Sequence, residues 1–301
     1  MSRTVAIIVN YNGANDTISC VNSLIVQNVP IYKIVIVDNN SPNNDYELLK
    51  KTFENDSNVI VLKSPKNGGF AYGNNIGIKH ILEFFEPDFF LLINNDTIAD
   101  RYMHEELLKA YEKSNDKRVG IVTGKIYYYN EKNKIWHAGG YFSKLKCSGY
   151  HFDYNKYDEN STKYEEIKEI TFATGCLWLL PVSVIKNVGY LPEEYFLYLE
   201  DTDYCLKLQQ QGYKIIYTPK AKVWHKVGAS SKNTEQTPNY YFINRNRIIL
   251  CKKYFGIFKT LLFILGFLIP TRFIRFLQFL LKGKIINTFE GILDGLKFRN
   301  K

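Results

Sequence analysis

The stretch Phe89-Phe90-Leu91-Leu92-Ile93-Asn94-Asn95-Asp96-Thr97 places an apolar run directly before two amides and a carboxylate. Such a run is typical of a strand that is buried on both faces of a parallel sheet. Open α/β sheets bind ligands beyond the carboxyl ends of their strands, which is where Asn94 and Asp96 fall. Their oxygens suit a hard divalent cation, although Asn and Asp also end strands simply by forming turns.

Two other acidic sites accompany this one along the chain. The apolar run 33–37 ends at Asp38, and the cluster Glu200-Asp201-Thr202-Asp203 stands at the predicted start of a helix. Acidic residues at the ends of several predicted strands and helices indicate an active site. The sequence therefore predicts a site assembled from three distant segments.

The first hundred residues alternate between short apolar runs and helical patterns, as βαβ units do. We predict strands at 5–9, 33–38, 59–62 and 89–93, and helices at 16–26, 45–55 and from 68 to about 85. Strands this apolar, separated by helices, predict an α/β fold with a Rossmann-like, mostly parallel sheet flanked by helices.

The following 150 residues have a different pattern. Paired strands are predicted at 120–129 and 135–142, and further strands at 174–180, 213–217 and 221–225. A helix is predicted from Glu200 to Gln211, ending at Gly212. Residues 143–168 are polar and rich in tyrosine with weak periodicity, so we interpret them as a mobile or partly disordered loop over the site.

The C-terminal segment carries nearly all of the net charge. Residues 251–301 contain ten Lys and Arg against Glu290 and Asp294, a net charge of +8 out of +9 for the chain. The apolar run Thr260–Pro270 is shorter than the roughly 20 residues of a membrane-spanning helix. Basic residues flank this run at Lys259, Arg272, Arg275, Lys282 and Lys284. This pattern predicts an amphipathic tail on an anionic membrane surface; the alternative is a helical pair packed on the domain.

Composition and charge restrict the class of protein. The 301 residues are 46% hydrophobic and 23% charged, as in ordinary globular proteins. Five scattered cysteines without a C-x-x-C pair favour free thiols in a reducing cytoplasm, and the N-terminus shows no basic-then-apolar leader pattern. Because the body outside the tail has a net charge of only +1, we expect no nucleic-acid partner.

Five motifs occur in an order that resembles a known family. They are Val9-Asn10-Tyr11-Asn12, Val37-Asp38-Asn39-Asn40-Ser41, Asn67-Gly68-Gly69-Phe70-Ala71, Asn94-Asn95-Asp96-Thr97 and Tyr198-Leu199-Glu200-Asp201-Thr202-Asp203. The set resembles the inverting family 2 glycosyltransferases with the GT-A fold, in particular the bacterial rhamnosyltransferase-like subgroup. The run Pro219-x-Ala221-x-Val223-Trp224-His225-x-x-Gly228-x-Ser230 and the pair Arg245-Asn246 are similar to that subgroup as well. The resemblance covers residues 4 to 250.

The resemblance implies a nucleotide site in the first half of the chain. Asp38 would accept a hydrogen bond from N3–H of a pyrimidine base, which a carboxylate can do. Asn10, Asn12 and Asn95 would contact the nucleotide, and Asn67 with Gly68 and Gly69 would let the backbone approach it closely. The alternatives are a turn-capping role for Asp38, turn residues for the two early asparagines and a tight helix entry for the glycines.

The resemblance also implies a metal and a catalytic base. Asp96 would bind Mn²⁺ or Mg²⁺, which neutralises a diphosphate leaving group, and His225 would be a metal or phosphate contact. The usual motif has Asp at both outer positions, whereas here Asn94 removes one charged ligand. Asp201 would take the proton from the acceptor hydroxyl.

Three more residues are candidate contacts for the acceptor or the donor sugar. Glu200 would bind sugar hydroxyls, and the indole of Trp178 would stack on a sugar ring, with core packing as its alternative. Arg245 would contact a pyrophosphate or belong to the basic surface of the tail. Asp203 is interpreted as a structural residue at the start of the helix.

The domain assignment and the function follow from these expectations. Residues 1–250 are predicted to form a GT-A catalytic domain, with a nucleotide half at about 1–100 and an acceptor half at about 101–250, followed by a membrane-associating tail at 251–301. The resemblance implies transfer of one sugar from a UDP- or dTDP-sugar to a lipid-linked saccharide in bacterial surface polysaccharide synthesis, on the inner face of the plasma membrane.

Other functions find less support in the sequence. The main alternative is a catalytically inactive nucleotide-sugar-binding or scaffold protein, which Asn94 would suit, although Asp96 and Asp201 are both present. A processive synthase would carry Q-x-x-R-W. A nicotinamide dehydrogenase would carry G-x-G-x-x-G after the first strand. The sequence contains neither motif at these places.

Overall fold

The computed structural model describes residues 2–116, 118–160, 165–226, 238–273 and 288–298. The apolar run 89–93 forms its central strand, β4 (Phe89–Ile93). All five of its residues are buried. Phe90 and Leu92 point to one face of the sheet, whereas Phe89, Leu91 and Ile93 point to the other. A strand covered on both sides needs apolar residues at every position, which explains the run.

The elements of the first half alternate as predicted. They are β1 (Thr4–Asn10), α1 (Ala14–Ile25), β2 (Lys33–Asp38), α2 (Asp45–Thr52), β3 (Val59–Lys63), α3 (Phe70–Phe84), β4, β5 (Thr97–Ala99) and α4 (Met103–Lys113). Strand β1 pairs in parallel with β2 and with β4, and β2 pairs in parallel with β3. The chain therefore adds β2 and β3 on one side of β1 and then β4 on the other side. The crevice at the carboxyl ends of β1 and β4 is the topological switch point of the sheet, where such folds bind ligands.

The second half extends the same sheet with mixed pairing. Its elements are β6 (Val119–Tyr128), β7 (Ile135–His137), β8 (Gly140–Ser143), β9 (Ser148–His151), η1 (Asp158–Asn160), β10 (Lys168–Ile170), β11 (Leu177–Pro181), α5 (Val182–Val188), η2 (Glu193–Tyr195), α6 (Glu200–Gln210) and β12 (Lys214–His225). The strand order is β10-β12-β6-β11-β4-β1-β2-β3, in which β11 is antiparallel to both of its neighbours.

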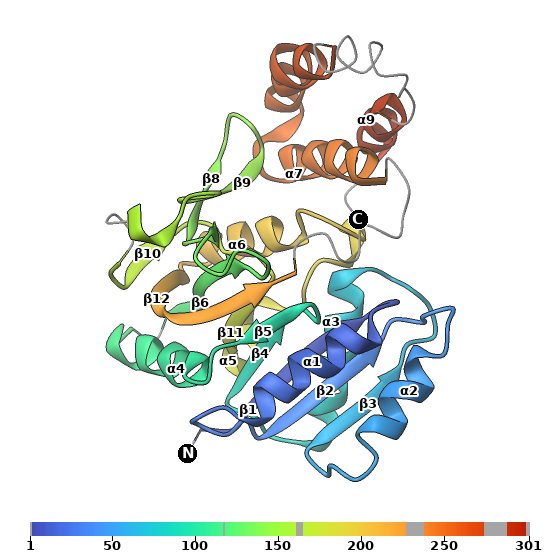
Figure 1. The fold of residues 1–301 in the computed structure, drawn as a ribbon. Coiled ribbons are helices and arrows are strands. Elements are labelled where there is room, and N and C mark those ends of the chain that lie inside the picture. The colour runs from blue at the N-terminus through green and yellow to red at the C-terminus, as the bar shows by residue number, and fades with distance from the viewer. Residues whose placement is uncertain (1, 117, 161–164, 227–237, 274–287, 299–301) are drawn as a thin grey trace.

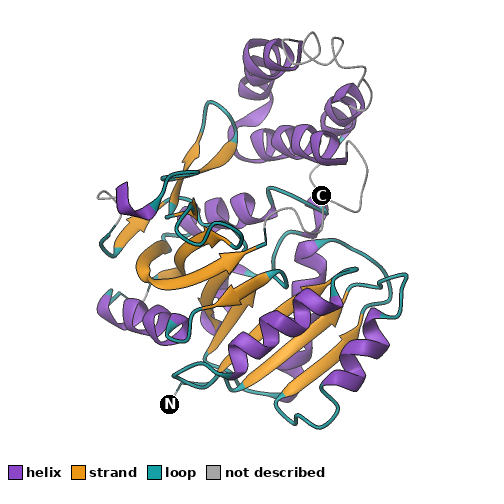
Figure 2. Ribbon diagram, viewed as in Figure 1, coloured by secondary structure: helices purple, strands orange, loops and turns teal. Residues whose placement is uncertain are grey.

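Two hydrophobic clusters cover the two faces of this sheet. One contains side chains of α3, α5 and α6, and the other contains side chains of α1, α2 and α4. Figure 2 shows the strands as one layer between helices. The predicted α/β fold with a mostly parallel, helix-flanked sheet is confirmed.

Two predictions about the second half are wrong. Residues 143–168 are not simply a loop, because β8 and β9 form an antiparallel hairpin and β10 begins at Lys168. The predicted strands 213–217 and 221–225 are a single strand, β12, with an irregular register between Thr218 and Lys222. There the carbonyl of Ala221 lies so close to Gly124 that a side chain at that glycine would collide with it.

The C-terminal helices lie on the side of the molecule where the site is built (Figure 1). They are α7 (Pro238–Phe263), the π-helical turn η3 (Ile264–Leu268) and α9 (Thr288–Lys297). Helix α7 runs across the predicted domain boundary at 250/251 without interruption, and it breaks only at Gly256, with φ 76°. The flanking positions Arg275, Lys282 and Lys284, and Gly228 and Ser230 of the subgroup motif, lie outside the described residues.

The apolar run Thr260–Pro270 belongs to a longer helical stretch than predicted. Within the described residues, one helix, Tyr240–Phe273, is long and apolar enough to cross a membrane by length and composition. It has 34 residues, and its apolar 18-residue window has a mean hydropathy of 1.7 and is only 22% buried. The break at Gly256 divides it into two legs, and residues 257–273 of the second leg would span roughly 25 Å at a rise of about 1.5 Å per residue.

Candidate functional site

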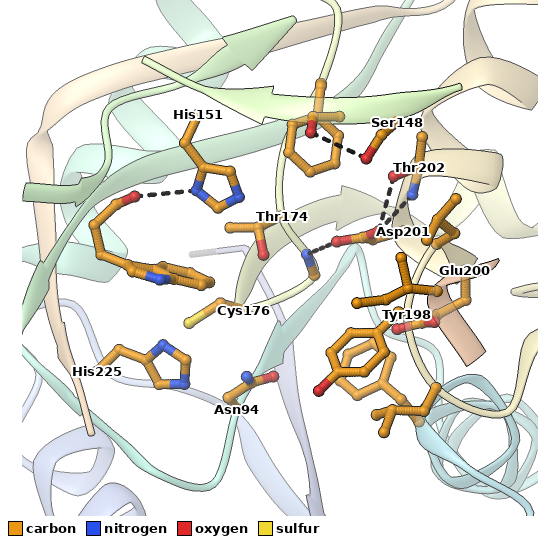
Figure 3. Close-up of a pocket in the computed structure, with 18 of the residues that line it drawn as sticks. Asn94, Ser148, His151, Thr174, Cys176, Tyr198, Glu200, Asp201, Thr202 and His225 are labelled. Carbon is orange, nitrogen blue, oxygen red and sulfur yellow. Dashed lines mark hydrogen bonds between the residues drawn. The ribbon is translucent and has the colours of Figure 1, made fainter. Parts of the chain in front are cut away.

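A cleft of about 560 Å³ opens beyond the carboxyl end of β4, lined also by the β8–β9 hairpin and α7. This volume is within the range of small-molecule sites. Figure 3 shows Asn94 and His225 on one side, Glu200 and Asp201 on the other, and Thr174 and Cys176 between them. The charged and aromatic residues of the lining are Phe70, Asp96, Trp136, His151, Phe172, Tyr198, Glu200, Asp201, His225 and Arg247.

Asp96 and His225 meet at the sheet end of this cleft. His225 is the last residue of β12, and its pairing with Thr97 of β5 brings its ring beside Asp96. The Nε2 atom of His225 lies 2.9 Å from Oδ1 of Asp96. Both residues are buried, and apart from this contact with His225, Oδ1 of Asp96 has no hydrogen-bond partner in the described part of the chain.

This pair fits a divalent cation. Two adjacent ligands that are each about 2.1 Å from an octahedral ion lie about 3 Å apart, close to the observed separation. A carboxylate with an imidazole favours Mn²⁺ over Mg²⁺. Among the described residues, no group of three or more His, Cys, Asp or Glu side chains could hold an ion alone. Water and ligand oxygens would therefore complete the coordination around Asp96 and His225.

The charge on His225 depends on its surroundings. Burial lowers the pKa of His225, but the neighbouring sulfur of Cys176 and the carboxylate of Asp96 outweigh burial and raise it to about 10. Without a cation, a proton on His225 therefore partly neutralises Asp96. Since a metal ligand must be neutral imidazole, a cation at this place would displace that proton.

An aromatic wall stands next to the metal candidates. The indole of Trp136 packs edge-on against His225 at 4.7 Å and against His151 at 4.9 Å between ring centroids. The Nδ1–H of His151 donates to the Trp136 carbonyl at 3.0 Å, and burial lowers the pKa of His151 to about 4, so the ring is neutral. Trp136 is half-buried and lines the cleft, where its ring is held in one place.

The two carboxylates on the far side have different surroundings. Oδ2 of Asp201 accepts from the Gly175 amide at 3.1 Å, and Oδ1 accepts from the Thr202 amide at 2.6 Å. Oε2 of Glu200 is buried and has no hydrogen-bond partner among the described residues. Burial raises the pKa of both groups, and that of Glu200 rises further because of the charge of Asp201. Of the two, Glu200 is therefore the one that stays protonated more readily.

The loop before α6 is held in an unfavourable backbone conformation. Phe196, Tyr198 and Leu199 have φ values of 63°, 67° and 70°, which bulky residues rarely adopt. The amide of Asn246 on α7 donates to the carbonyls of Tyr195, Leu197 and Tyr198 at 2.8 to 3.0 Å. Helix α7 therefore fixes the loop that aims Glu200 and Asp201 into the cleft.

Asp203 ties α6 to the same helix. Its fully buried carboxylate accepts from Tyr195 at 2.6 Å, from Lys253 at 2.7 Å and from Tyr254 at 2.6 Å. Asp203 thus has the structural role that we predicted. Because Lys253 and Tyr254 belong to the predicted tail, that tail contributes to the fold of the catalytic part.

The predicted nucleotide residues lie outside the lining of this cleft, around the ends of β1 and β2. Asn10 and Asp38 have no exposed surface. The amide of Asn10 donates to Asp38 at 2.8 Å, and the Ser41 hydroxyl donates to the same Asp38 oxygen at 2.6 Å. Asp38 therefore caps the 38–41 turn, the alternative that the sequence left open. A bond from Asp38 to a base stays a prediction, and it requires this turn to open.

The other predicted nucleotide residues border the same edge of the sheet. Asn12 is exposed. The side-chain amide of Asn95 donates a hydrogen bond to the Thr17 hydroxyl, which in turn donates one to Oδ1 of Asn10. Asn67 accepts from Asn39 at 3.0 Å. Their contacts with a nucleotide stay predictions.

The glycines have a local reason in the fold. A Cβ at Gly69, which has φ 88°, would lie 2.0 Å from the Phe196 carbonyl, and a Cβ at Gly68 would collide with Tyr72. Glycine is therefore required at position 69, where the residue before α3 packs against the loop before α6.

Two predicted sugar or phosphate contacts are wrong in this structure. Trp178 is fully buried in β11 and stacks on Tyr204, so it has no surface to offer a sugar. Arg245 turns away from the cleft and donates to the Glu194 carbonyl at 3.1 Å. The residues on the cleft are instead Trp136 and Arg247. Trp136 could have been found from the sequence, because it lies beside His137 in a predicted strand. Arg247 could not, because the sequence does not show which face of the helix meets the cleft.

The comparisons agree with this architecture. The family Glycosyl transferase family 2 matches residues 5–189. The chain is similar to the low-salt glycan biosynthesis hexosyltransferase Agl10 of Haloferax volcanii, with 22% identity over 83% of this chain and 76% of the relative. It is also similar to the rhamnosyltransferase WbbL of Escherichia coli, with 25% identity over 62% of this chain and 70% of the relative.

A solved structure shares the fold. The crystal structure of GalNAc-T7 with UDP, GalNAc and Mn²⁺ superposes with a TM-score of 0.64 and 14% identity. The match covers 84% of this chain and 48% of that chain, so this chain spans about half of its length. The likeness concerns the arrangement of the sheet and its helices.

Proposed function

Because the chain belongs to glycosyltransferase family 2, we propose that it transfers a single sugar, with inversion, from a UDP- or dTDP-sugar to a lipid-linked saccharide. The observation that carries this proposal is one cleft that holds both Asp96 and His225, a pair that fits a cation, and the half-buried carboxylate of Asp201 across from His225. The relatives named for low-salt glycan biosynthesis in Haloferax volcanii and for rhamnosyl transfer in Escherichia coli support a role in polysaccharide synthesis, which we propose takes place at a bacterial surface.

In the proposed reaction, the acceptor hydroxyl attacks the anomeric carbon of the donor. A new C–O bond forms there as the bond to the diphosphate oxygen breaks, and the hydroxyl proton passes to Asp201. Burial raises the pKa of Asp201, which makes it a stronger base than an exposed Asp. A divalent cation at Asp96 and His225 would supply positive charge for the leaving diphosphate. The Oε2 atom of Glu200, buried beside the base, can bind a sugar hydroxyl.

The test of this proposal is calorimetric titration of the full chain with UDP and with dTDP, with and without Mn²⁺. We expect binding of at least one nucleotide that Mn²⁺ strengthens about tenfold or more. A folded protein that binds neither nucleotide would contradict the proposal. Metal-dependent nucleotide binding without transfer to any acceptor would instead favour the scaffold alternative.

The second leg of the C-terminal helices supports a membrane partner. Phe258, Leu262 and Leu265 lie on one side of the helix and are 72%, 57% and 65% exposed. The opposite side packs into a cluster with Cys147, Ile248 and Ile292. Exposed apolar patches on this scale mark interaction sites, and the net charge of +8 in residues 251–301 matches an anionic bilayer.

Replacing Phe258, Leu262 and Leu265 together with Ser is expected to reduce binding to phosphatidylglycerol-containing vesicles about tenfold or more, because less apolar surface enters the bilayer. Flotation of the full chain with vesicles measures this. Truncation after Cys251 is a poor substitute, since it removes Lys253 and Tyr254 from the buried Asp203. The control replaces three exposed apolar residues far from the tail, Ile25, Val26 and Phe84, with Ser. Equal vesicle binding by both triple variants would place the membrane contact elsewhere.

A further inference from the structure

His151 presents an unused ring nitrogen to the cleft. The ring is half-buried and lines the cleft from β9. Its hydrogen bonds are all made by Nδ1, which lies 3.0 Å from the carbonyl of Trp136 and 3.1 Å from Nδ1 of His137. Within the described residues, Nε2 has no hydrogen-bond partner. Figure 3 shows this second nitrogen on the side of the ring that faces Thr174 and the interior of the cleft.

The contacts of Nδ1 decide the tautomer of His151. A carbonyl oxygen can only accept, so Nδ1 of His151 carries the hydrogen that the Trp136 carbonyl receives. The Nδ1 atom of His137 faces the same hydrogen and must offer a lone pair, which leaves the hydrogen of this fully buried ring on its Nε2. Because the neutral His151 ring carries a single hydrogen, its Nε2 is a hydrogen-bond acceptor. Two protein groups therefore hold His151 in the accepting state.

His151 lies one side chain away from the pair that fits a cation. The indole of Trp136 contacts the ring of His225 at 4.7 Å and the ring of His151 at 4.9 Å between centroids, so a single indole separates the two histidines. A donor with its diphosphate at Asp96 and His225 would place its sugar between this pair and Asp201, which serves the attacking hydroxyl. His151 borders that space from the β9 side (Figure 3).

The groups around Nε2 suit a sugar better than a phosphate. A nitrogen lone pair repels phosphate oxygens and attracts O–H groups. Phe172 packs against the His151 ring at 5.6 Å between centroids, so aromatic rings flank the acceptor and can cover the apolar face of a sugar. Thr174 adds a hydroxyl that has no hydrogen-bond partner among the described residues and can donate or accept.

We propose that Nε2 of His151 accepts a hydrogen bond from a hydroxyl of the donor sugar, so that His151 is a specificity-determining residue of the transfer. This inference rests on the proposed function. A site built to pair with a substrate hydroxyl discriminates strongly against an analogue that lacks it, because the protein group is then left without a partner. The ribose of the nucleotide also carries hydroxyls, and the free nucleotide separates that source from the sugar.

The experiment is calorimetric titration of the full chain in the presence of Mn²⁺. The wild type is first titrated with UDP, UDP-glucose, UDP-galactose, UDP-N-acetylglucosamine, dTDP and dTDP-rhamnose. The nucleotide sugar with the largest gain in affinity over its free nucleotide is the probe for His151→Asn and His151→Gln. Asn can still donate to the Trp136 carbonyl but has no group at the position of Nε2. Gln, in contrast, places an amide oxygen at about that position.

We expect His151→Asn to weaken binding of the probe about five- to tenfold, the effect of losing one neutral hydrogen bond. Its affinity for the free nucleotide should stay within about twofold of the wild type, and His151→Gln should bind the probe within about threefold of the wild type. The matched control is His80→Asn, which changes a half-buried histidine of α3 outside the cleft lining and should alter neither affinity.

Deoxy analogues of the probe identify the hydroxyl. We expect one analogue to bind about five- to tenfold more weakly than the probe to the wild type, and equally well as the probe to His151→Asn. This loss of the difference in the variant is a result that a merely structural role of His151 does not produce.

Each contrary result has its own meaning. A probe that binds His151→Asn as tightly as the wild type would overturn the assignment, as would a wild type that gains no affinity from any of the sugars. Equal losses in His151→Asn and His151→Gln would assign the effect to the shape of the ring, and an equal loss for the free nucleotide would assign it to the ribose; both overturn the contact with the sugar. A wild type that binds no nucleotide contradicts the proposed function instead.

Discussion

Asp201→Asn is expected to lower the rate of sugar transfer by about 10²- to 10⁴-fold, the usual contribution of a general base. Asn keeps the shape of Asp, and its one carbonyl oxygen can still accept from one of the two amides, Gly175 and Thr202, that now bind separate oxygens of Asp201. The amide cannot take a proton from the acceptor hydroxyl. The affinity for UDP in the presence of Mn²⁺ should therefore stay within about twofold while transfer is lost. Single-turnover transfer assays and calorimetry measure the two quantities separately.

The pH dependence of the transfer rate is a second test of Asp201 as the base. Asp201 must be deprotonated to act as a base, so transfer is expected to fall as the pH drops through its folded pKa. Burial raises this pKa above the value of about 3.9 for an exposed Asp, so the loss begins at a higher pH than for a solvent-exposed carboxylate. The residual activity of Asp201→Asn should lack this acidic limb.

The neighbouring Glu200→Gln variant is the matched control. Glu200 holds a proton more readily than Asp201 does, because burial and the charge of Asp201 both raise its pKa. A neutral Gln resembles a protonated Glu, and we expect a loss of transfer at least about tenfold smaller than for Asp201→Asn. If Glu200→Gln lost the acidic limb and Asp201→Asn kept it, the base would be Glu200.

Asp96→Asn is expected to weaken Mn²⁺-dependent binding of UDP by about 100-fold, because a metal-bound charge contributes several kcal/mol to binding a diphosphate. The substitution removes the negative charge from one of the two groups whose atoms lie 2.9 Å apart in the cleft. Binding of UDP without metal should change little. Titrations of UDP at fixed concentrations of Mn²⁺ check this expectation, and buffers with different ionisation enthalpies would detect the proton that the ion displaces from His225.

Asp88→Asn is the matched control at the opposite end of the same strand. Asp88 directly precedes β4, is exposed, and accepts from the backbone amide of Arg3. Its substitution should leave the Mn²⁺ dependence of UDP binding unchanged. Equal losses in Asp88→Asn and Asp96→Asn would indicate a general effect on the fold, and an unchanged Asp96→Asn would remove the proposed cation site.

The N-terminal half shows how far local sequence pattern reaches. The strands Lys33–Asp38 and Phe89–Ile93 begin and end where predicted. The side chains of residues 34–37 and 89–93 are buried on both faces, so these positions are all apolar, and polar residues mark the strand ends. The 143–168 segment was misinterpreted because a short hairpin with half-buried residues leaves little periodicity to detect.

The residues of the cleft could be predicted from local sequence pattern only in part. Asp96 and Asp201 were identified by their places beside a strand end and a helix start, and the structure brings both to one cleft. Trp178 and Arg245 were predicted as ligand contacts, whereas Trp136 and Arg247 are the Trp and the Arg that line the cleft. Which face of a strand or a helix meets a cavity depends on what packs against the other face, and that information lies in distant segments.

The sequence by itself determined the α/β fold, the family and the acidic residues at the ends of the central elements, because burial and turn chemistry act over a few neighbouring residues. Only the tertiary structure decided that His225 stands 2.9 Å from Asp96, that Asn10 donates to Asp38, and that α7 fixes the loop before Asp201. These contacts join residues far apart in the chain. Their geometry follows from strand register and helix packing, which no local pattern encodes.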